Sequence, residues 1–109
     1  MSVFQAEVID GLNYDKKHNI AYLYIKDVLT FENEDIHLRL LNQKLANYLS
    51  FIVSGELDEY IESKDYDKEI IIDFISDPPQ NIKKILNYYH ESLDKRDIEL
   101  RWTVTSLKS

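Results

Sequence analysis

The sequence predicts an α+β domain, a two-layer sandwich in which two helices cover one face of a mixed four-stranded sheet. The 109 residues are 44% apolar and 30% charged, which is ordinary for one compact domain spanning residues 1–109. Apolar residues alternate in four segments and recur at helical spacing in two others, in the order ββαβαβ. Because strand–helix–strand crossovers are almost always right-handed, both helices are expected on the same face of the sheet.

A hairpin opens the chain. The first strand is expected from about Glu7 to Tyr14 and the second from Ile20 to Asp27, with a polar loop over residues 15–19 between them. Side chains alternate between the two faces of a strand. In the second strand we assign one face, which carries the smaller aliphatic residues, to the core: Ala21, Leu23 and Ile25.

A long helix is expected from about Glu34 to Ser54. Asn33 can cap its start, because asparagine side chains accept hydrogen bonds from the first free N–H groups of a helix. Gly55 suits the left-handed position just past a helix end. At helical spacing the apolar residues of one arc form the expected core face, namely Leu38, Leu41, Leu45, Tyr48, Leu49 and Ile52.

The second half of the chain continues with a strand, a helix and a strand. The acidic residues 56–69 indicate a short helical extension followed by a solvated loop. The apolar run from Glu69 to Ile75 predicts a central strand. Asp77-Pro78-Pro79-Gln80 is typical of a helix start capped by Asp77. The last strand is expected from Asp97 to Thr105, with its inward residues Ile98, Leu100, Trp102 and Val104.

The charge balance favours some partners and excludes others. Lys and Arg number 13 against 20 Asp and Glu, a net charge of −7. This is the wrong sign for binding nucleic acid and favours attraction to a basic partner. The absence of cysteine excludes disulfides, thiolate metal sites and cysteine nucleophiles. No apolar run approaches the ~20 residues of a membrane helix and no signal peptide is expected, so the predicted location is cytoplasmic, without membrane contact.

The long helix carries a motif that resembles a known family. Residues 37–57 read HLRLLNQKLANYLSFIVSGEL, and Val8-Ile9-Asp10 lies near the start of the chain. These segments resemble the signature HLxLLxxKLxxYLxFIxSGEL of small uncharacterised bacterial proteins known only as a domain of unknown function. The resemblance implies a bacterial intracellular protein and supplies no catalytic residue. The family usually has tryptophan where this chain has Phe31.

The back of the long helix is the first candidate surface. It carries apolar residues almost opposite the core arc, with two polar residues among them: Ile36, Leu40 and Phe51, with Lys44 and Asn47. One interpretation is that the amino-terminal segment or the acidic loop covers them. The other is an interface of a twofold homodimer, because exposed apolar patches mark association sites.

The second candidate surface is the uncovered face of the sheet. It is expected to display a mixed aromatic and charged set: Tyr22, Tyr24, Asp73, Glu99 and Arg101. Tyrosine and arginine are enriched at binding hot spots. The alternative is an ordinary solvated face in which Arg101 pairs with Asp73 or Glu99.

Catalytic and metal chemistry have little support in the sequence. The three histidines lack metal-binding spacing, the acidic loop lacks the glycine and glutamate of a calcium loop, and no catalytic residue, metal or cofactor is predicted. His37 with Glu34 and Asp35 can form an acid–base cluster or simply a charged helix entry. A ligand pocket between the hairpin and the helix would be lined by Tyr14, Tyr24, Phe31 and His37.

The leading hypothesis is a non-enzymatic, acidic protein–protein interaction module, expected to be a homodimer. An inhibitor or immunity-type protein that binds a basic partner fits, because negative charge steers such partners. The alternative is a small-ligand-binding or hydrolytic protein with its pocket near the strand-to-helix turn.

Overall fold

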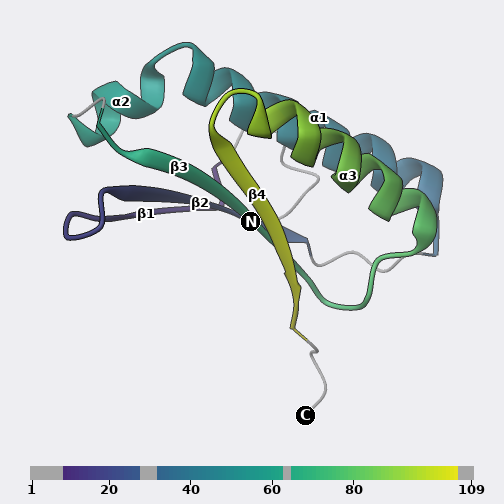
Figure 1. Ribbon diagram of the computed structural model, residues 1–109. Coiled ribbons are helices and arrows are strands. Elements are labelled where there is room, and N and C mark those ends of the chain that lie inside the picture. The colour runs from purple at the N-terminus through teal and green to yellow at the C-terminus, as the bar shows by residue number, and fades with distance from the viewer. Residues whose placement is uncertain (1–8, 28–31, 63–64, 106–109) are drawn as a thin grey trace.

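The computed structural model describes residues 9–27, 32–62 and 65–105 (Figure 1). The sheet and the α+β class agree with the sequence prediction, and the acidic segment contributes a third, short helix. The elements are β1 (Gly11–Asp15), β2 (Ile20–Asp27), α1 (Glu34–Val53), α2 (Glu56–Ile61), β3 (Asp67–Phe74), α3 (Gln80–Asp94) and β4 (Ile98–Val104).

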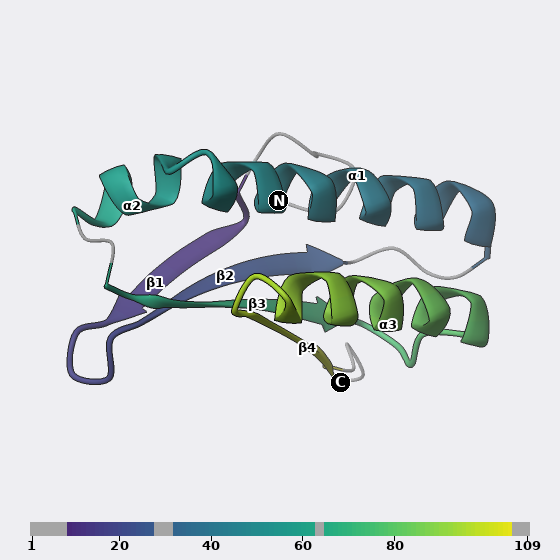
Figure 2. The same cartoon turned by 45° about the horizontal axis from the view of Figure 1, so that its top comes forward.

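The four strands lie across the sheet in chain order, β1-β2-β3-β4. β1 pairs with β2 in antiparallel fashion, and β2, β3 and β4 are parallel to one another. The sheet is therefore mixed, and β3 has the interior position that its run of isoleucines predicts. Both long helices, α1 and α3, lie on the same side of the sheet (Figures 1 and 2).

The core lies between these helices and the sheet. Ala21, Leu23 and Ile25 of β2 are all 0% exposed, so their face of the strand is the one that the helices cover. Burying a Leu or Ile side chain contributes about 1.5–3 kcal/mol. The fully buried partners from the other elements are Leu41, Leu45, Tyr48, Leu57, Ile70, Ile72, Phe74, Ile82, Leu86 and Leu93.

Local chemistry sets the ends of α1 as the sequence predicts. The Asn33 side chain accepts a hydrogen bond from the backbone N–H of Ile36 at 3.2 Å. At the other end the Ser54 N–H donates to the Ser50 carbonyl at 2.9 Å, and Gly55 has a φ of 89°. Only glycine adopts this left-handed conformation without strain, so Gly55 lets the chain turn directly into α2.

Three expectations about the other elements are wrong in detail. β1 begins at Gly11 and not near Glu7, which lies outside the described residues. α3 has Pro79 at its cap position, and the Asp77 carboxylate instead accepts a bond from Lys83 Nζ at 3.4 Å. Val104 shares its face of β4 with the buried Leu100, but as the last residue of the strand it is 47% exposed rather than buried.

Candidate functional site

A row of side chains crosses the helix-free face of the sheet. Tyr24 of β2, Ile71 of β3 and Arg101 of β4 are direct partners in the strand register. They alternate with the buried residues of the same strands, so they point away from the helices. Ile71 at the centre of the row is only 7% exposed, whereas Arg101 at its end is open to solvent. The row thus has an apolar middle and a cationic end.

Two tyrosines on β2 form the aromatic part of this face. The rings of Tyr22 and Tyr24 are stacked, with centroids 6.5 Å apart and planes 27° from parallel. Gly11 of β1 is paired with Tyr24. A Cβ added at Gly11 would lie 3.3 Å from the Tyr24 Cβ and 3.4 Å from Cδ2. Because Gly11 has no side chain, the Tyr24 ring can pack closely against the backbone of β1.

The ion pair of Arg101 differs from the predicted one. Its Nε donates to Glu69 Oε1 at 2.8 Å, not to Asp73 or Glu99. Glu69 lies two residues before Ile71, the register partner of Arg101, so a long side chain reaches it diagonally. The Asp73 carboxylate instead accepts a bond from the Thr103 hydroxyl at 3.1 Å.

Acidic residues outnumber basic ones on this face. By the alternation of the strands, the acids are Asp15, Asp67, Glu69, Asp73 and Glu99, and the bases are Lys26 and Arg101. The same alternation places the five predicted open-face residues on this one surface: Tyr22, Tyr24, Asp73, Glu99 and Arg101. We call this surface the tyrosine face.

The back of α1 is not the exposed surface that the sequence suggested. Lys44 was expected at an interface, but it is 0% exposed. Its Nζ lies 3.0 Å from Oδ1 of Asp10, and that carboxylate is also 0% exposed. The prediction for Lys44 is wrong because an acid just before β1 draws the ammonium group into the molecule. A buried charge is tolerated when it has such a partner.

Asp10 joins three parts of the fold. Its Oδ2 accepts a bond from the backbone N–H of Lys26 at 2.9 Å, and its own N–H donates to the Tyr48 hydroxyl at 2.8 Å. The Tyr48 hydroxyl in turn donates to the Tyr24 carbonyl. Burial raises the pKa of Tyr48; the hydrogen bond from the Asp10 N–H opposes this rise, and the charge of the Asp10 carboxylate adds to it to a smaller extent. The chain before β1 is thus bound to both α1 and β2.

The other residues of the predicted interface are partly covered. Leu40 and Phe51 are half-buried and pack against the core. Asn47 and Phe51 line a hollow of about 230 Å³ together with Ile9, which precedes β1. Ile36 remains 47% exposed. Ile9 and Asp10, from the segment before β1, thus lie beside Asn47, Phe51 and Lys44, whereas the dimer interface stays a prediction.

The residues of the predicted ligand pocket do not come together. Tyr14 is the register partner of Ala21 near the start of β2, whereas His37 contacts Asp27 at its end. At about 3.3 Å per residue these positions are about 20 Å apart. Tyr14 packs edge-on against Tyr66, with ring centroids 5.8 Å apart. Phe31, the other predicted lining residue, lies outside the described residues.

His37 forms a buried pair that the sequence did not reveal. Its Nε2 contacts the Asp27 carboxylate, and the two side chains are 1% and 0% exposed. Of the two acids expected beside His37, Glu34 accepts a bond from Asn81 Nδ2 at 3.4 Å and Asp35 is exposed. The pair joins the start of α1 to the end of β2, out of reach of solvent.

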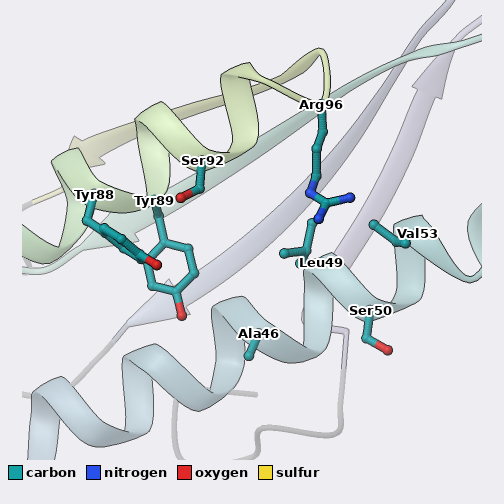
Figure 3. Close-up of a pocket in the computed structure, with 8 residues that line it drawn as sticks. All are labelled: Ala46, Leu49, Ser50, Val53, Tyr88, Tyr89, Ser92 and Arg96. Carbon is teal, nitrogen blue, oxygen red and sulfur yellow. The ribbon is translucent and has the colours of Figure 1, made fainter.

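A groove that sequence reasoning missed lies between α1 and α3 (Figure 3). It encloses about 470 Å³. Small and apolar residues of α1 face aromatic and polar residues on and just after α3, namely Ala46, Leu49, Ser50 and Val53 against Tyr88, Tyr89, Ser92 and Arg96. The sequence feature that indicates this groove is the pair Tyr88-Tyr89. Tyr89 lies on the buried face of the amphipathic helix α3, whereas Tyr88 is an aromatic residue on its polar face and is 62% exposed.

Two further findings concern metals and membranes. In residues 9–27, 32–62 and 65–105, histidine and carboxylate side chains do not gather into a group that could hold a metal ion. Over the same residues, every helix is too short or too polar to cross a bilayer.

Comparison with known proteins gives one assignment. Neither the curated proteins nor the solved structures contain a match to this chain. The sequence model of DUF6572, a family of unknown function, matches residues 1–106. That match covers all the elements described above, including the buried Asp10, His37, Lys44 and Tyr48. The chain therefore belongs to DUF6572.

Proposed function

We propose that this protein is a non-enzymatic binding module that docks a basic protein partner on the tyrosine face. The observation that carries the proposal is the row of Tyr24, Ile71 and Arg101, which lies among acidic side chains on the face without helices. Tyrosine and arginine dominate the energetic centres of protein interfaces, and polar residues typically form their rims.

The charges on this face favour a cationic partner. Glu99 is exposed and lies opposite Glu69, whose carboxylate already binds Arg101. The Asp73 carboxylate accepts one bond from Thr103 and has capacity for more. With the net charge of −7, these acids would attract and orient a basic surface during encounter. An inhibitor or immunity-type role toward a basic protein is compatible with this chemistry.

The buried polar pairs have a structural role. Asp27 with His37 and Asp10 with Lys44 are pairs of ionisable groups of the kind that acid–base catalysis uses. All four side chains are at most 1% exposed, so they do not touch a molecule at the surface. Their hydrogen bonds join α1 to β2 and to the segment before β1, and so they hold the sheet behind the tyrosine face.

Affinity capture from the native host tests the proposal. Tyr24→Ala removes the aromatic end of the row, and Glu99→Lys reverses one charge at a position where lysine can pair with Glu69. Tyr60→Ala and Glu91→Lys make the same changes at exposed positions on α2 and α3. Circular dichroism of each variant confirms that it is folded.

We expect the wild type and both control variants to retain a basic protein that elutes with added salt. Each tyrosine-face variant should bind it at least tenfold more weakly, about 1.4 kcal/mol. Three results would each refute the proposal. The tyrosine-face variants could capture the basic protein as well as the wild type does, the control variants could lose it to the same extent as the tyrosine-face variants, or none of the retained proteins could be basic.

The homodimer and the cytoplasmic location remain predictions. Self-association through the back of α1 would now depend chiefly on Ile36, because Lys44 is buried and Leu40 and Phe51 pack inward. Ile36→Glu changes an exposed residue and should leave the fold intact. A sedimentation experiment in which the wild type is a dimer and Ile36→Glu a monomer would support the interface, whereas a monomeric wild type would exclude it.

A further inference from the structure

We propose that the groove between α1 and α3 binds a small aromatic carboxylic acid. The site is independent of the proposed docking surface, because the helices lie on the face of the sheet opposite the tyrosine face (Figures 1 and 2). The groove volume of about 470 Å³ falls within the range of small-molecule sites, about 300–1,000 Å³.

The cationic end of the groove is Arg96, which follows the last turn of α3. Its backbone N–H donates to the Leu93 carbonyl at 2.9 Å, so its position is fixed relative to the helix. Figure 3 shows its side chain extending across to α1 near Leu49. Among the described residues, Arg96 forms no ion pair with a carboxylate. A guanidinium group binds a carboxylate through two parallel hydrogen bonds, so Arg96 would hold the acid group.

The aromatic end is formed by Tyr88 and Tyr89. Their ring centroids are 5.5 Å apart and their planes 81° from parallel. The Tyr89 hydroxyl donates to Asn42 Oδ1 of α1 at 2.5 Å, which fixes its ring against that helix. The Tyr88 ring remains 62% exposed and can stack on an aromatic ring of the ligand.

The distance between the two ends limits the ligand. Tyr88 and Arg96 are eight positions apart in the chain, about 12 Å between their Cα atoms at the rise of an α-helix. This spacing suits a ring on a short alkyl chain that ends in a carboxylate. Leu49 of α1 lies near Arg96 and supplies apolar lining, and Val53, which is 56% exposed, continues that lining beyond Arg96 (Figure 3). Ala46 and Ser50, which have small side chains, complete the α1 side of the groove.

Calorimetric titration with 4-phenylbutyrate tests the inference. Two compounds serve as controls: 4-phenylbutanol lacks the charge, and butyrate lacks the ring. Arg96→Gln removes the guanidinium group, and Ala46→Trp fills the groove. Arg39→Gln makes the same charge change at an exposed position of α1 outside the groove. Because Arg96, Ala46 and Arg39 are all exposed, these variants should fold.

We expect saturable binding of 4-phenylbutyrate that is at least tenfold tighter than binding of either control compound. Arg96→Gln should weaken it at least tenfold, Ala46→Trp should abolish it, and Arg39→Gln should leave it unchanged. The inference is wrong if 4-phenylbutyrate does not bind at millimolar concentration, or if Arg96→Gln has no larger effect than Arg39→Gln. Neither result bears on the basic partner, whose test uses residues on the opposite face.

Discussion

Breaking the buried pair of Lys44 and Asp10 should remove a large part of the net stability of the fold. Lys44→Met keeps an unbranched side chain but removes the ammonium group. The Asp10 carboxylate then retains the backbone N–H of Lys26 but loses a counter-ion 3.0 Å away, at a site with 0% exposure. Removing one member of a buried ion pair costs about 3–5 kcal/mol. A domain of this size has a folding free energy of about 5–15 kcal/mol, so the variant should lose a large fraction of it.

Urea denaturation measures this loss, with far-ultraviolet circular dichroism and the fluorescence of Trp102 as independent probes. Asp10→Asn combined with Lys44→Met removes both charges, so the double variant should lose clearly less than the sum of the single losses. Lys83→Met is the matched control, because Lys83 pairs with Asp77 at 3.4 Å with both side chains well exposed. It should cost less than about 1 kcal/mol. A loss that small for Lys44→Met, or strictly additive losses, would refute the reasoning.

Two further predictions concern Tyr48 and Gly55. Burial raises the pKa of Tyr48 above its usual 10.0. Above pH 10 the unfolded chain therefore loses this proton while the folded chain keeps it. The free energy of unfolding then falls as pH rises, by up to about 1.4 kcal/mol per pH unit. Tyr48→Phe should make the fall shallower in urea midpoints between pH 9 and 11, and an unchanged slope would contradict this. Gly55→Ala should lower the free energy of unfolding by about 1–2 kcal/mol in thermal and urea unfolding, because φ is 89°. No atom lies within 4 Å of an added Cβ, so this cost is backbone strain and not a steric clash. Gly55→Asn should cost less, because asparagine tolerates the left-handed conformation better than alanine. Equal stability of all three proteins would show that the left-handed turn carries no strain.

The tyrosine face could be predicted because strand alternation is a local property. Once Leu23 and Ile25 are assigned to the core, Tyr22 and Tyr24 must point to the other side of β2. The partner of Arg101 could not be predicted in the same way. It depends on the register between β3 and β4, which brings Glu69 within reach of Arg101.

The predicted pocket failed for a related reason. Tyr14 and His37 both lie near turns in the sequence, which suggested one site between the hairpin and the helix. The length of β2 separates them, since Tyr14 pairs with Ala21 and His37 contacts Asp27. The groove between α1 and α3 was missed because it depends on the relative placement of two helices that are separated in the chain by α2 and β3.

The sequence by itself determined the α+β class, the order of the elements, the ends of α1 at Asn33 and Gly55, and the two faces of each strand. These follow from hydrophobic periodicity and from hydrogen bonds within a few residues. Only the tertiary structure decided the strand order, the burial of Lys44 and the pairing of His37 with Asp27. A lysine on a helix is expected to be exposed unless a partner for its charge is known. The partner of Lys44 is Asp10, which lies 34 residues away in the chain, so no local pattern indicates it. The contact exists because β1 and β2 pair and place Asp10 beneath α1, an arrangement that no local pattern encodes.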